Sequence, residues 1–467
     1  MNVKRFTQKI PGSLDLLSLH EFRPERYPYL LESVAKGTAN SRYDILFAFP
    51  GSSLVLNEFL GHQGPVPMRL RGNDFLKNLD FWLQLEPKIE DDIPDLPFHG
   101  GWFVYLSYEL AAQVEPTLKL PMLPRSLPVA FATRCPAAII QDHHEQCLYL
   151  VAEGEEDFRL QAMVDDIDLV RQQPLKDARP ITIHNLQQED PQRYIEAVHK
   201  VHDYILAGDI FQANVSRLWQ GQLAGRYRPC ELYRRLRLSN PAPFAGLARW
   251  QDASIISSSP ERLLRVKDGL AETRPIAGTR PRLRDAQGAF SDQHDKAMTQ
   301  ELIGHPKERA EHVMLIDLER NDLGRVCIPG SVKVDEFMVL ESYAHVHHIV
   351  SNVQGRLREE VSAGDAIRAL FPGGTITGCP KVRCMEIIAE LEQRPREAYT
   401  GSMGYINLNG DMDLNILIRT LIQDGDEVQF RAGAGLVVDS IAEKEVDETL
   451  AKARGMLMAL GSEEKAN

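Results

Sequence analysis

The sequence predicts a mixed α+β fold, and three observations support this class. Short apolar runs with β-strand character occur along the whole chain. Helix-start signals accompany amphipathic stretches in the second half. Strands and helices follow one another without strict alternation, which a doubly wound parallel sheet would require. The chain has 467 residues, 43% hydrophobic and 25% charged, as is ordinary for globular proteins of one large or two to three medium domains.

The first part of the chain is predicted to form short strands and loops. Residues 43–50 (YDILFAFP) and 147–152 (CLYLVA) are apolar and compatible with strands. Residues 87–97 are acidic and proline-rich, which predicts a surface loop, and residues 172–180 are polar with two prolines. We therefore expect an N-terminal region over residues 1–180 and a second domain over residues 190–460.

Helix signals in the second half are clearer. Asp190 followed by Pro191 predicts a helix that ends at Gly208 and buries residues at spacings of three and four: Tyr194, Val198, Val201 and Ile205. Further helices are expected from His305-Pro306, from Pro380, and from Ser440, which forms a capping box with Glu443. Strands are expected over residues 254–258, 348–353, 402–408 and 428–432.

Charge and composition exclude several classes of partner. The net charge of -13 argues against nucleic acid or an anionic membrane as the main partner. The first residues carry no apolar signal segment, and no run reaches the ~18 apolar residues of a membrane span, so we expect a cytoplasmic protein. No two cysteines form a CxxC pair, which predicts reduced thiols and no zinc site; the six are Cys135, Cys147, Cys230, Cys327, Cys379 and Cys384.

Two pairs of glutamates share the spacing i, i+3, which places both members on one face of a helix. Glu308 and Glu311 form the first pair, and Glu445 and Glu448 form the second. Two interpretations remain open from spacing alone. The pairs lie on solvated helix faces with nearby lysine and arginine, or they face one another across a cleft and hold a hydrated Mg²⁺ ion.

Three glycine-containing segments would let the backbone approach a small neighbouring group or molecule closely. They are residues 275–279 (PIAGT), 371–381 (FPGGTITGCPK) and 431–436 (RAGAGL). The middle segment leads into a helix start beside Lys381, an arrangement that suits a carboxylate but lacks the spacing of a nucleotide P-loop. Each segment is either a tight structural turn or, together with Tyr405 and Arg419, part of a pocket for a dicarboxylate.

Several long strings occur in an order that resembles the chorismate-binding enzymes. They are SPERLL (259–264), TRPIAGTRPR (273–282), ERAEHVMLIDLERNDLGRVC (308–327), HHIVS (347–351), FPGGTITGCPKVRCMEII (371–388), GSMGYI (401–406) and AGAGLVVDS (432–440). The resemblance covers roughly residues 190–460. It implies a central antiparallel β-sandwich with flanking helices and an active site in a cleft.

The resemblance also implies roles for individual residues. Glu311 and Glu448 would bind Mg²⁺, supported by Glu308 and Glu445, and the ion would hold the ring carboxylate of chorismate. Glu261 would be the general acid that protonates the leaving C4 hydroxyl, and His348 would lie against the ring. The residues expected to contact substrate are Gly278, Thr279, Lys381, Tyr405, Arg419, Gly433, Ala434 and Gly435.

The incoming nucleophile separates members of this family. Hydroxylating members use a lysine base, and the matching position here is Gln212. An amide is no base near neutral pH, so we expect ammonia from a glutamine amidotransferase partner. Ala277 replaces the lysine that attacks C2 in one C4-aminating form, which favours C2 amination to anthranilate. The strings GGTITG and SRYDI favour C4 amination, which we expect; a non-catalytic chorismate-binding subunit is the alternative of another class.

A tryptophan pocket is a further implication of the resemblance. The matching residues come from two parts of the chain that would meet in the fold. They are Ser33, Asn40, Ser41, Arg42 and Tyr43 from the N-terminal region, and Pro243, Phe244 and Ala245 from the second. Arg42 is expected to face the carboxylate of the amino acid.

Overall fold

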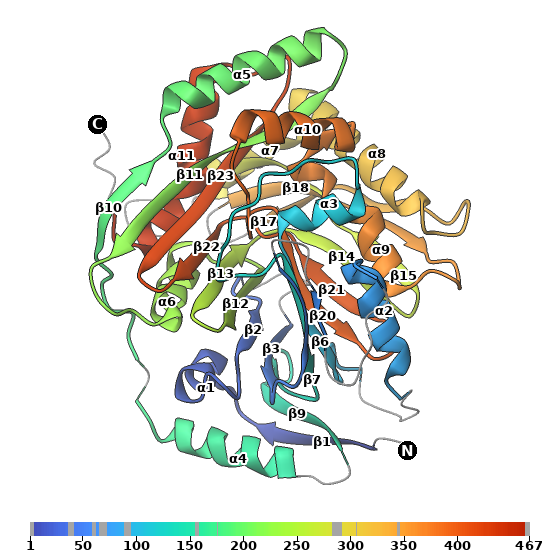
Figure 1. Cartoon of the computed structure of the whole chain (residues 1–467). Helices are drawn as coiled ribbons and strands as arrows, with labels where there is room; N and C mark the ends of the chain where they lie inside the picture. Colours follow the sequence, from blue (N-terminus) through green and yellow to red (C-terminus); the bar gives the residue numbers. More distant parts are fainter. Residues whose placement is uncertain are drawn as a thin grey trace.

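Two antiparallel β-sheets with helices on their outer sides make up the protein (Figure 1). The computed structural model describes residues 4–35, 42–57, 62–64, 72–87, 95–154, 158–174, 176–282, 292–304, 306–342 and 346–462. The predicted α+β class with antiparallel sheets is confirmed.

The first sheet contains the N-terminal strand at one edge and strands from after residue 180 at the other. In spatial order its strands are β1 (Lys4–Pro11), β9 (Cys147–Gly154), β8 (Ala137–Asp142), β3 (Tyr43–Ala48), β2 (Tyr29–Glu32), β12 (Phe244–Trp250), β13 (Ala253–Ser259), β22 (Thr420–Asp424), β23 (Glu427–Leu436), β11 (Gln212–Leu223) and β10 (Ile183–Gln188). The short β19 (Gly378–Cys379) also pairs with β11.

The second sheet, like the first, contains strands from before residue 180 and strands from after residue 190. Its order is β16 (Ile276–Pro281), β18 (Val346–Arg356), β15 (Leu270–Thr273), β14 (Arg262–Lys267), β21 (Met412–Asn415), β20 (Ser402–Asn407), β6 (Gly101–Leu106), β7 (Ala130–Cys135), β4 (Ser53–Leu56) and β5 (His62–Gln63), with β17 (Lys333–Ser342) also on β18. Because β2 pairs with β12 and β6 pairs with β20, each sheet joins residues before 180 to residues after 190. The division into two regions stays a prediction.

Aromatic side chains fill the space between the two sheets. Phe103 of the second sheet stacks on Tyr29 of the first at 4.1 Å between ring centroids and contacts Phe47 edge-on at 5.5 Å. Phe131 stacks on Trp250 at 4.3 Å in the same way. Such pairs add about 0.5–1.5 kcal/mol beyond the burial of their area, so this layer holds the sheets face to face.

Helices cover the outer faces (Figure 1). Their bounds are α1 (Leu16–Phe22), α2 (Phe75–Leu85), α3 (Ala111–Val114), α4 (Phe158–Arg171), α5 (Pro191–Leu206), α6 (Pro229–Ser239), α7 (Asp292–Gly304), α8 (Pro306–Gly324), α9 (Ala363–Leu370), α10 (Lys381–Glu392) and α11 (Ala442–Ala459), with 3₁₀ turns η1 (Tyr108–Leu110) and η2 (Gly374–Ile376). Helices α1, α4, α6 and α11 pack on the first sheet, and α2, α8 and α9 pack on the second. None of the described helices has the length and apolar character needed to cross a bilayer.

The helix signals of the second half are confirmed with one exception. The Asp190 carboxylate accepts a hydrogen bond from the backbone N–H of Gln192 at 3.0 Å, and α5 begins at the following proline. Helix α8 begins at Pro306 and α10 begins directly after Pro380, while His305 lies outside the described residues. The expected strands are also present as β13, β18, β20 and β23.

The predicted capping box at Ser440 is wrong. The Ser440 hydroxyl accepts a hydrogen bond from the backbone N–H of Val437 at 3.1 Å, so it closes the preceding turn and the helix is capped at Ile441 without a side-chain bond. The reading of residues 1–180 as strands and loops also missed helices. Helix α4 buries Leu160, Met163 and Ile167 at helical spacing between charged residues.

Candidate active site

Glu261 lies between β13 and β14, where its backbone is held on both sides. Its N–H donates to the hydroxyl of Ser259 at 3.2 Å, and its carbonyl accepts from the N–H of Ile416 at 3.0 Å. Burial raises the pKa of the carboxyl to about 7, opposed in part by the Thr375 hydroxyl and by the charges of Lys452 and Arg419. A carboxyl of this kind carries a proton near neutral pH, as a general acid must.

Arg419 acts electrostatically on both Glu261 and His348. Burial, followed by the charge of Arg419, lowers the pKa of His348 to about 4, so this ring is neutral at physiological pH. Nδ1 of His348 lies 3.2 Å from the carbonyl oxygen of Gly278. Because a carbonyl only accepts, Nδ1 carries the ring hydrogen. One charge and one hydrogen bond therefore link Glu261 to three predicted residues: Arg419 acts on Glu261 and on His348, and His348 bonds Gly278.

Gly278 brings helix α8 to the same place. Its φ of +62° lies in the left-handed region, and a Cβ at this position would lie 2.1 Å from Oε2 of Glu308. Only glycine fits such a contact. Thr279 follows on β16 and lies opposite His348 in the β16–β18 ladder.

The two glutamate pairs lie on different helices, Glu308 and Glu311 on α8 and Glu445 and Glu448 on α11. Glu448 is joined to Lys452 of the same helix at 2.8 Å, and Lys452 in turn acts on Glu261. Within the described residues no three acidic, histidine or cysteine side chains gather closely enough to form a metal cage. One pair is thus linked to the backbone at Gly278 through Glu308, and the other to Glu261 through Glu448 and Lys452.

Strands β11 and β23 form another wall of the site. Residues 431–436 lie within β23, so the expected glycine loop is in fact a strand. A Cβ at Gly435 would lie 2.2 Å from Nε2 of Gln212, and one at Gly433 would lie 2.7 Å from the hydroxyl of Tyr399. Ala434 lies between them and pairs with Val215 of β11. Gly433 is required because a Cβ there would also lie 2.5 Å from the backbone carbonyl oxygen of Val215, and at Gly435 the end of the Gln212 side chain occupies the place of a Cβ.

Two predicted substrate contacts have protein partners of their own. Nζ of Lys381 is 2.5 Å from Oδ2 of Asp322 and 3.0 Å from the carbonyl oxygen of Leu370, so it neutralises a buried acid. Tyr405 packs edge-on against Phe98 in the layer between the sheets, with ring centroids 5.7 Å apart. The roles of both side chains as substrate contacts stay predictions.

The structure adds two residues that the sequence reasoning missed. Nζ of Lys452 lies 3.0 Å from the carbonyl oxygen of Gly433 as well as pairing with Glu448. Its spacing of four from Glu448 is a signal that would have pointed to it. Tyr399 is the second; it lies six residues before Tyr405, and a choice between two nearby tyrosines needs the fold.

A cavity of about 670 Å³, whose lining does not include Glu261, is formed by N-terminal residues together with residues of the segments 243–245, 262–268 and 403–415. Its wall contains the described residues of the predicted tryptophan pocket, namely Ser33, Arg42, Tyr43, Pro243, Phe244 and Ala245, together with Tyr405. Asn40 and Ser41 lie outside the described residues. The guanidinium of Arg42 is paired with Asp142 at 2.9 Å, so it is already engaged by a protein carboxylate.

The chain is similar to known proteins in sequence and in fold. A family model described as chorismate binding enzyme matches residues 61–458. The chain is 40% identical to aminodeoxychorismate synthase component 1 of Bacillus subtilis, over 84% of this chain and 83% of that protein. It is 38% identical to anthranilate synthase component 1 of Pseudomonas aeruginosa, over 94% of this chain and 91% of that protein.

Solved structures show the same architecture. Anthranilate synthase component I from Streptococcus pneumoniae superposes with a TM-score of 0.76 at 31% identity, covering 90% of this chain and 93% of that one. The menaquinone-specific isochorismate synthase from Escherichia coli superposes with a TM-score of 0.72 at 17% identity, covering 98% of this chain and 95% of that one. With the family model covering most of its length, this chain belongs to the family of chorismate-binding enzymes.

Proposed function

We propose that this protein aminates chorismate at C4, as component I of an aminodeoxychorismate synthase. In the net reaction ammonia replaces the C4 hydroxyl group, which leaves as water. The observation that carries the proposal is the buried Glu261, whose pKa of about 7 suits it to protonate that hydroxyl. Hydroxide is a poor leaving group, so the proton from Glu261 lowers the barrier to its departure.

The residues around Glu261 suit an anionic substrate. Chorismate carries two carboxylates, and Arg419 and Lys452 supply two cations whose charges reach Glu261. Gly433 and Gly435 allow close approach of the β23 backbone, with the hydroxyl of Tyr399 beside Gly433. We assign Tyr399, in place of Tyr405, to the substrate pocket. His348, neutral at physiological pH, orients the ring rather than donating a charge.

Mg²⁺ fits the carboxylate pairs through their chemistry. Mg²⁺ prefers oxygen ligands, keeps several waters and uses only one or two protein carboxylates together with substrate oxygens. Such an ion does not require a preformed cage of three or more acids. Glu311 and Glu448 would hold it, with Glu308 and Glu445 in support, and when bound it would supply positive charge to the ring carboxylate.

Gln212 supports ammonia as the nucleophile. Its side chain lies against Gly435, and within the described residues its amide oxygen accepts no hydrogen bond. An amide oxygen can accept an N–H of ammonia but cannot deprotonate water. We therefore propose that a separate glutamine amidotransferase subunit supplies ammonia to this side of the site.

Amination at C2 to give anthranilate is the second candidate. Position 277 is alanine, so no lysine is present there to attack C2, and the C4 route would need ammonia or another small nucleophile to add first at C2. Relatives of both kinds match over most of this chain. The strings GGTITG and SRYDI, residues 373–378 and 41–45, are our reason for ranking C4 amination first.

One assay separates these activities. The purified chain is incubated with chorismate, Mg²⁺ and a high concentration of ammonium salt, with and without aminodeoxychorismate lyase. We expect 4-aminobenzoate only when the lyase is present. Anthranilate fluorescence without lyase would establish C2 amination instead, and no chorismate consumption in either arm would favour a non-catalytic binding subunit.

The 670 Å³ cavity supports a bound tryptophan. Its volume falls in the range of small-molecule sites, and its wall combines aromatic, apolar and cationic side chains. Arg42 is paired with Asp142, and Arg262 and Arg265 of the wall are likewise paired with Asp413 and Glu272, so whichever of these three cations meets the amino acid's carboxylate would share its charge with a protein carboxylate. Isothermal calorimetry with tryptophan tests this; no heat with tryptophan-free protein would contradict it.

A further inference from the structure

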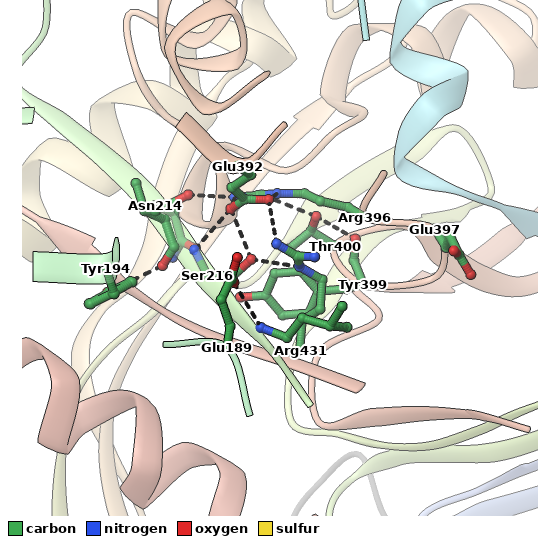
Figure 2. Close-up of polar contacts among 12 residues, drawn as sticks. Glu189, Tyr194, Asn214, Ser216, Glu392, Arg396, Glu397, Tyr399, Thr400 and Arg431 are labelled. Atoms are coloured by element: carbon green, nitrogen blue, oxygen red, sulfur yellow. Dashed lines mark hydrogen bonds and ion pairs between the residues drawn. The ribbon is translucent and has the colours of Figure 1, made fainter. Parts of the chain in front are cut away.

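Glu392, at the end of α10, is a buried carboxylate bound from several sides (Figure 2). Its Oε1 accepts hydrogen bonds from the N–H and the hydroxyl of Ser216, both at 2.9 Å, and from Arg396 at 2.7 Å. Its Oε2 accepts from Arg396 and from Arg431, each at 3.0 Å. We call Glu392, Arg396 and Arg431 the Glu392 cluster.

The cluster remains ionised although it is buried. Burial alone would raise the pKa of Glu392, but the charges of Arg396 and Arg431 and the hydrogen bonds outweigh it, so that the pKa is lowered. Five donors occupy the acceptor positions of this carboxylate. A buried charge of this kind is held in one geometry, because any movement would break a charge-assisted hydrogen bond.

Arg396 extends the cluster to the segment that carries Tyr399. Its guanidinium donates to the carbonyl of Asn214 at 2.6 Å and to the hydroxyl of Thr400 at 3.3 Å. It also lies over the ring of Tyr399, 5.4 Å from the centroid, with the ring of Tyr108 at 4.9 Å. The ring of Tyr399 and the residue after it are thus both fixed by Arg396.

Arg431 fixes the strand that faces Tyr399. It belongs to β23, two residues before Gly433, and its Nε donates to the Ser216 hydroxyl at 2.9 Å. The hydroxyl of Tyr399 lies against Gly433, as its 2.7 Å distance from a Cβ there shows. The carboxylate of Glu392 therefore holds in place, through Arg396 and Arg431, both the ring of Tyr399 and the strand beside which the Tyr399 hydroxyl lies.

We infer that the Glu392 cluster positions Tyr399 for chorismate, with Glu392 as a positioning residue that does not itself touch substrate. This inference rests on the proposed use of chorismate but not on whether the product is aminated at C4 or C2. Exchange of Glu392 for glutamine keeps its shape, removes its charge and puts an N–H₂ group where an acceptor is needed. The Tyr399 segment is then no longer held in place.

Steady-state kinetics of Glu392→Gln test the inference in the full-length chain with Mg²⁺ and ammonium salt. We expect the KM for chorismate to rise about tenfold or more, since a displacement of ~1 Å can cost up to about a hundredfold in catalysis. The KM for ammonium should stay unchanged. Calorimetric titration of chorismate without ammonium should show the same loss of affinity.

Asp166→Asn is the matched control. Asp166 is also a buried carboxylate bound by two arginines and a tyrosine hydroxyl, with Arg23 at 2.8 Å, Arg26 at 2.6 Å and Tyr27 at 2.7 Å. It lies on α4, which Figure 1 shows at the opposite end of the molecule from α10. This variant should lose stability while its KM for chorismate remains within twofold of wild type.

A double variant decides whether Glu392 acts through Tyr399. If it does, Glu392→Gln combined with Tyr399→Phe raises KM little more than the larger single change. Multiplied effects, or a normal KM in a folded Glu392→Gln protein, would overturn the inference. If Glu392→Gln does not fold, Arg431→Lys carries the same expectation, because the single nitrogen of lysine cannot reproduce the two separate guanidinium bonds, from Nε to Ser216 and from a terminal nitrogen to Glu392.

The proposed function fails by a different result. A wild-type chain that consumes no chorismate at high ammonium refutes catalysis, and the calorimetric comparison of wild type, Glu392→Gln and Asp166→Asn then still reports on the cluster. Wild-type protein that binds no chorismate at all would overturn both.

Discussion

Glu261 and Glu392 are the same residue type at nearly the same burial, yet their pKa values shift in opposite directions. Glu392 receives two guanidinium groups and the N–H and hydroxyl of Ser216 directly on its oxygens. Around Glu261 the cations Arg419 and Lys452 act electrostatically, and Oε1 has no hydrogen-bond partner within the described residues. Donors bonded directly to its oxygens thus keep Glu392 ionised. The scarcity of such donors lets Glu261 hold a proton that it can give up.

The largest effect that would test this contrast is the loss of the acid. We expect Glu261→Gln to lower kcat by about 10²–10⁴-fold, the usual contribution of a general acid. The Mg²⁺ concentration that gives half-maximal activity should hardly change, because Glu261 is not among the proposed metal ligands. Equal losses of turnover and Mg²⁺ affinity, measured by chorismate consumption, would refute the acid role.

The next effect is on stability. Glu392→Gln leaves two buried arginines without their carboxylate, a change that typically costs about 3–5 kcal/mol. Asp166→Asn should cost less, because the side chains of its partners Arg23 and Arg26 are 46% and 26% exposed, against 1% and 4% for Arg396 and Arg431. Urea unfolding of both variants measures the difference. A smaller loss for Glu392→Gln than for Asp166→Asn would contradict the comparison.

The two carboxylates should also give opposite pH dependence of stability. The folded-state pKa of Glu261 is raised from 4.5 to about 7, so its contribution is fully present below pH ~4.5 and is lost as pH rises through 7. Glu261→Gln should therefore gain on wild type between pH 5 and pH 8, on the order of 3 kcal/mol. The pKa of Glu392 is lowered, so its stabilisation exists above the unfolded pKa and is lost at acid pH.

Urea unfolding of the metal-free and substrate-free proteins from about pH 3 to about pH 8 is the measurement, because the pH dependence due to Glu392 lies below the unfolded pKa of glutamate and that due to Glu261 lies above it. Difference curves for Glu261→Gln and Glu392→Gln that slope in the same direction would break the comparison. Buried Glu319 and Glu109 also have raised pKa values, so only differences from wild type isolate each residue.

The sequence was informative where the signal is local. Asp190-Pro191 starts α5 because capping and proline geometry act within one helical turn. The antiparallel sheets could be expected from the family resemblance, but the pairing of β2 with β12 joins segments about 200 residues apart, and no local pattern specifies such a register. The hydroxyl of Ser440 could bond either the preceding turn or the first turn of the helix, and in the structure it bonds the preceding turn at Val437.

The site was predictable in part for the same reason. Long motifs pointed to His348 and Gly278, which a hydrogen bond joins, and to Glu261, which shares the charge of Arg419 with His348. Lys381 was expected at an anion site because it begins a helix, but the buried Asp322 attracts it more strongly, which only the packing of α8 reveals. Tyr399 and Tyr405 are separated by six residues, and the strand β20 carries the second one away toward the aromatic layer.

The two tyrosines give the smallest test of how the site is built. Tyr399→Phe removes the hydroxyl beside Gly433 and should raise the KM for chorismate about tenfold, as expected when a hydrogen bond to a charged group worth about 1.5–3 kcal/mol is lost. Tyr405→Phe changes a side chain in the wall of the 670 Å³ cavity, so chorismate kinetics should stay within about twofold of wild type while any tryptophan affinity changes. The reverse pattern, a raised KM for Tyr405→Phe and an unchanged KM for Tyr399→Phe, would place Tyr405 in the substrate pocket. It would also overturn the inference that the Glu392 cluster positions Tyr399 for chorismate.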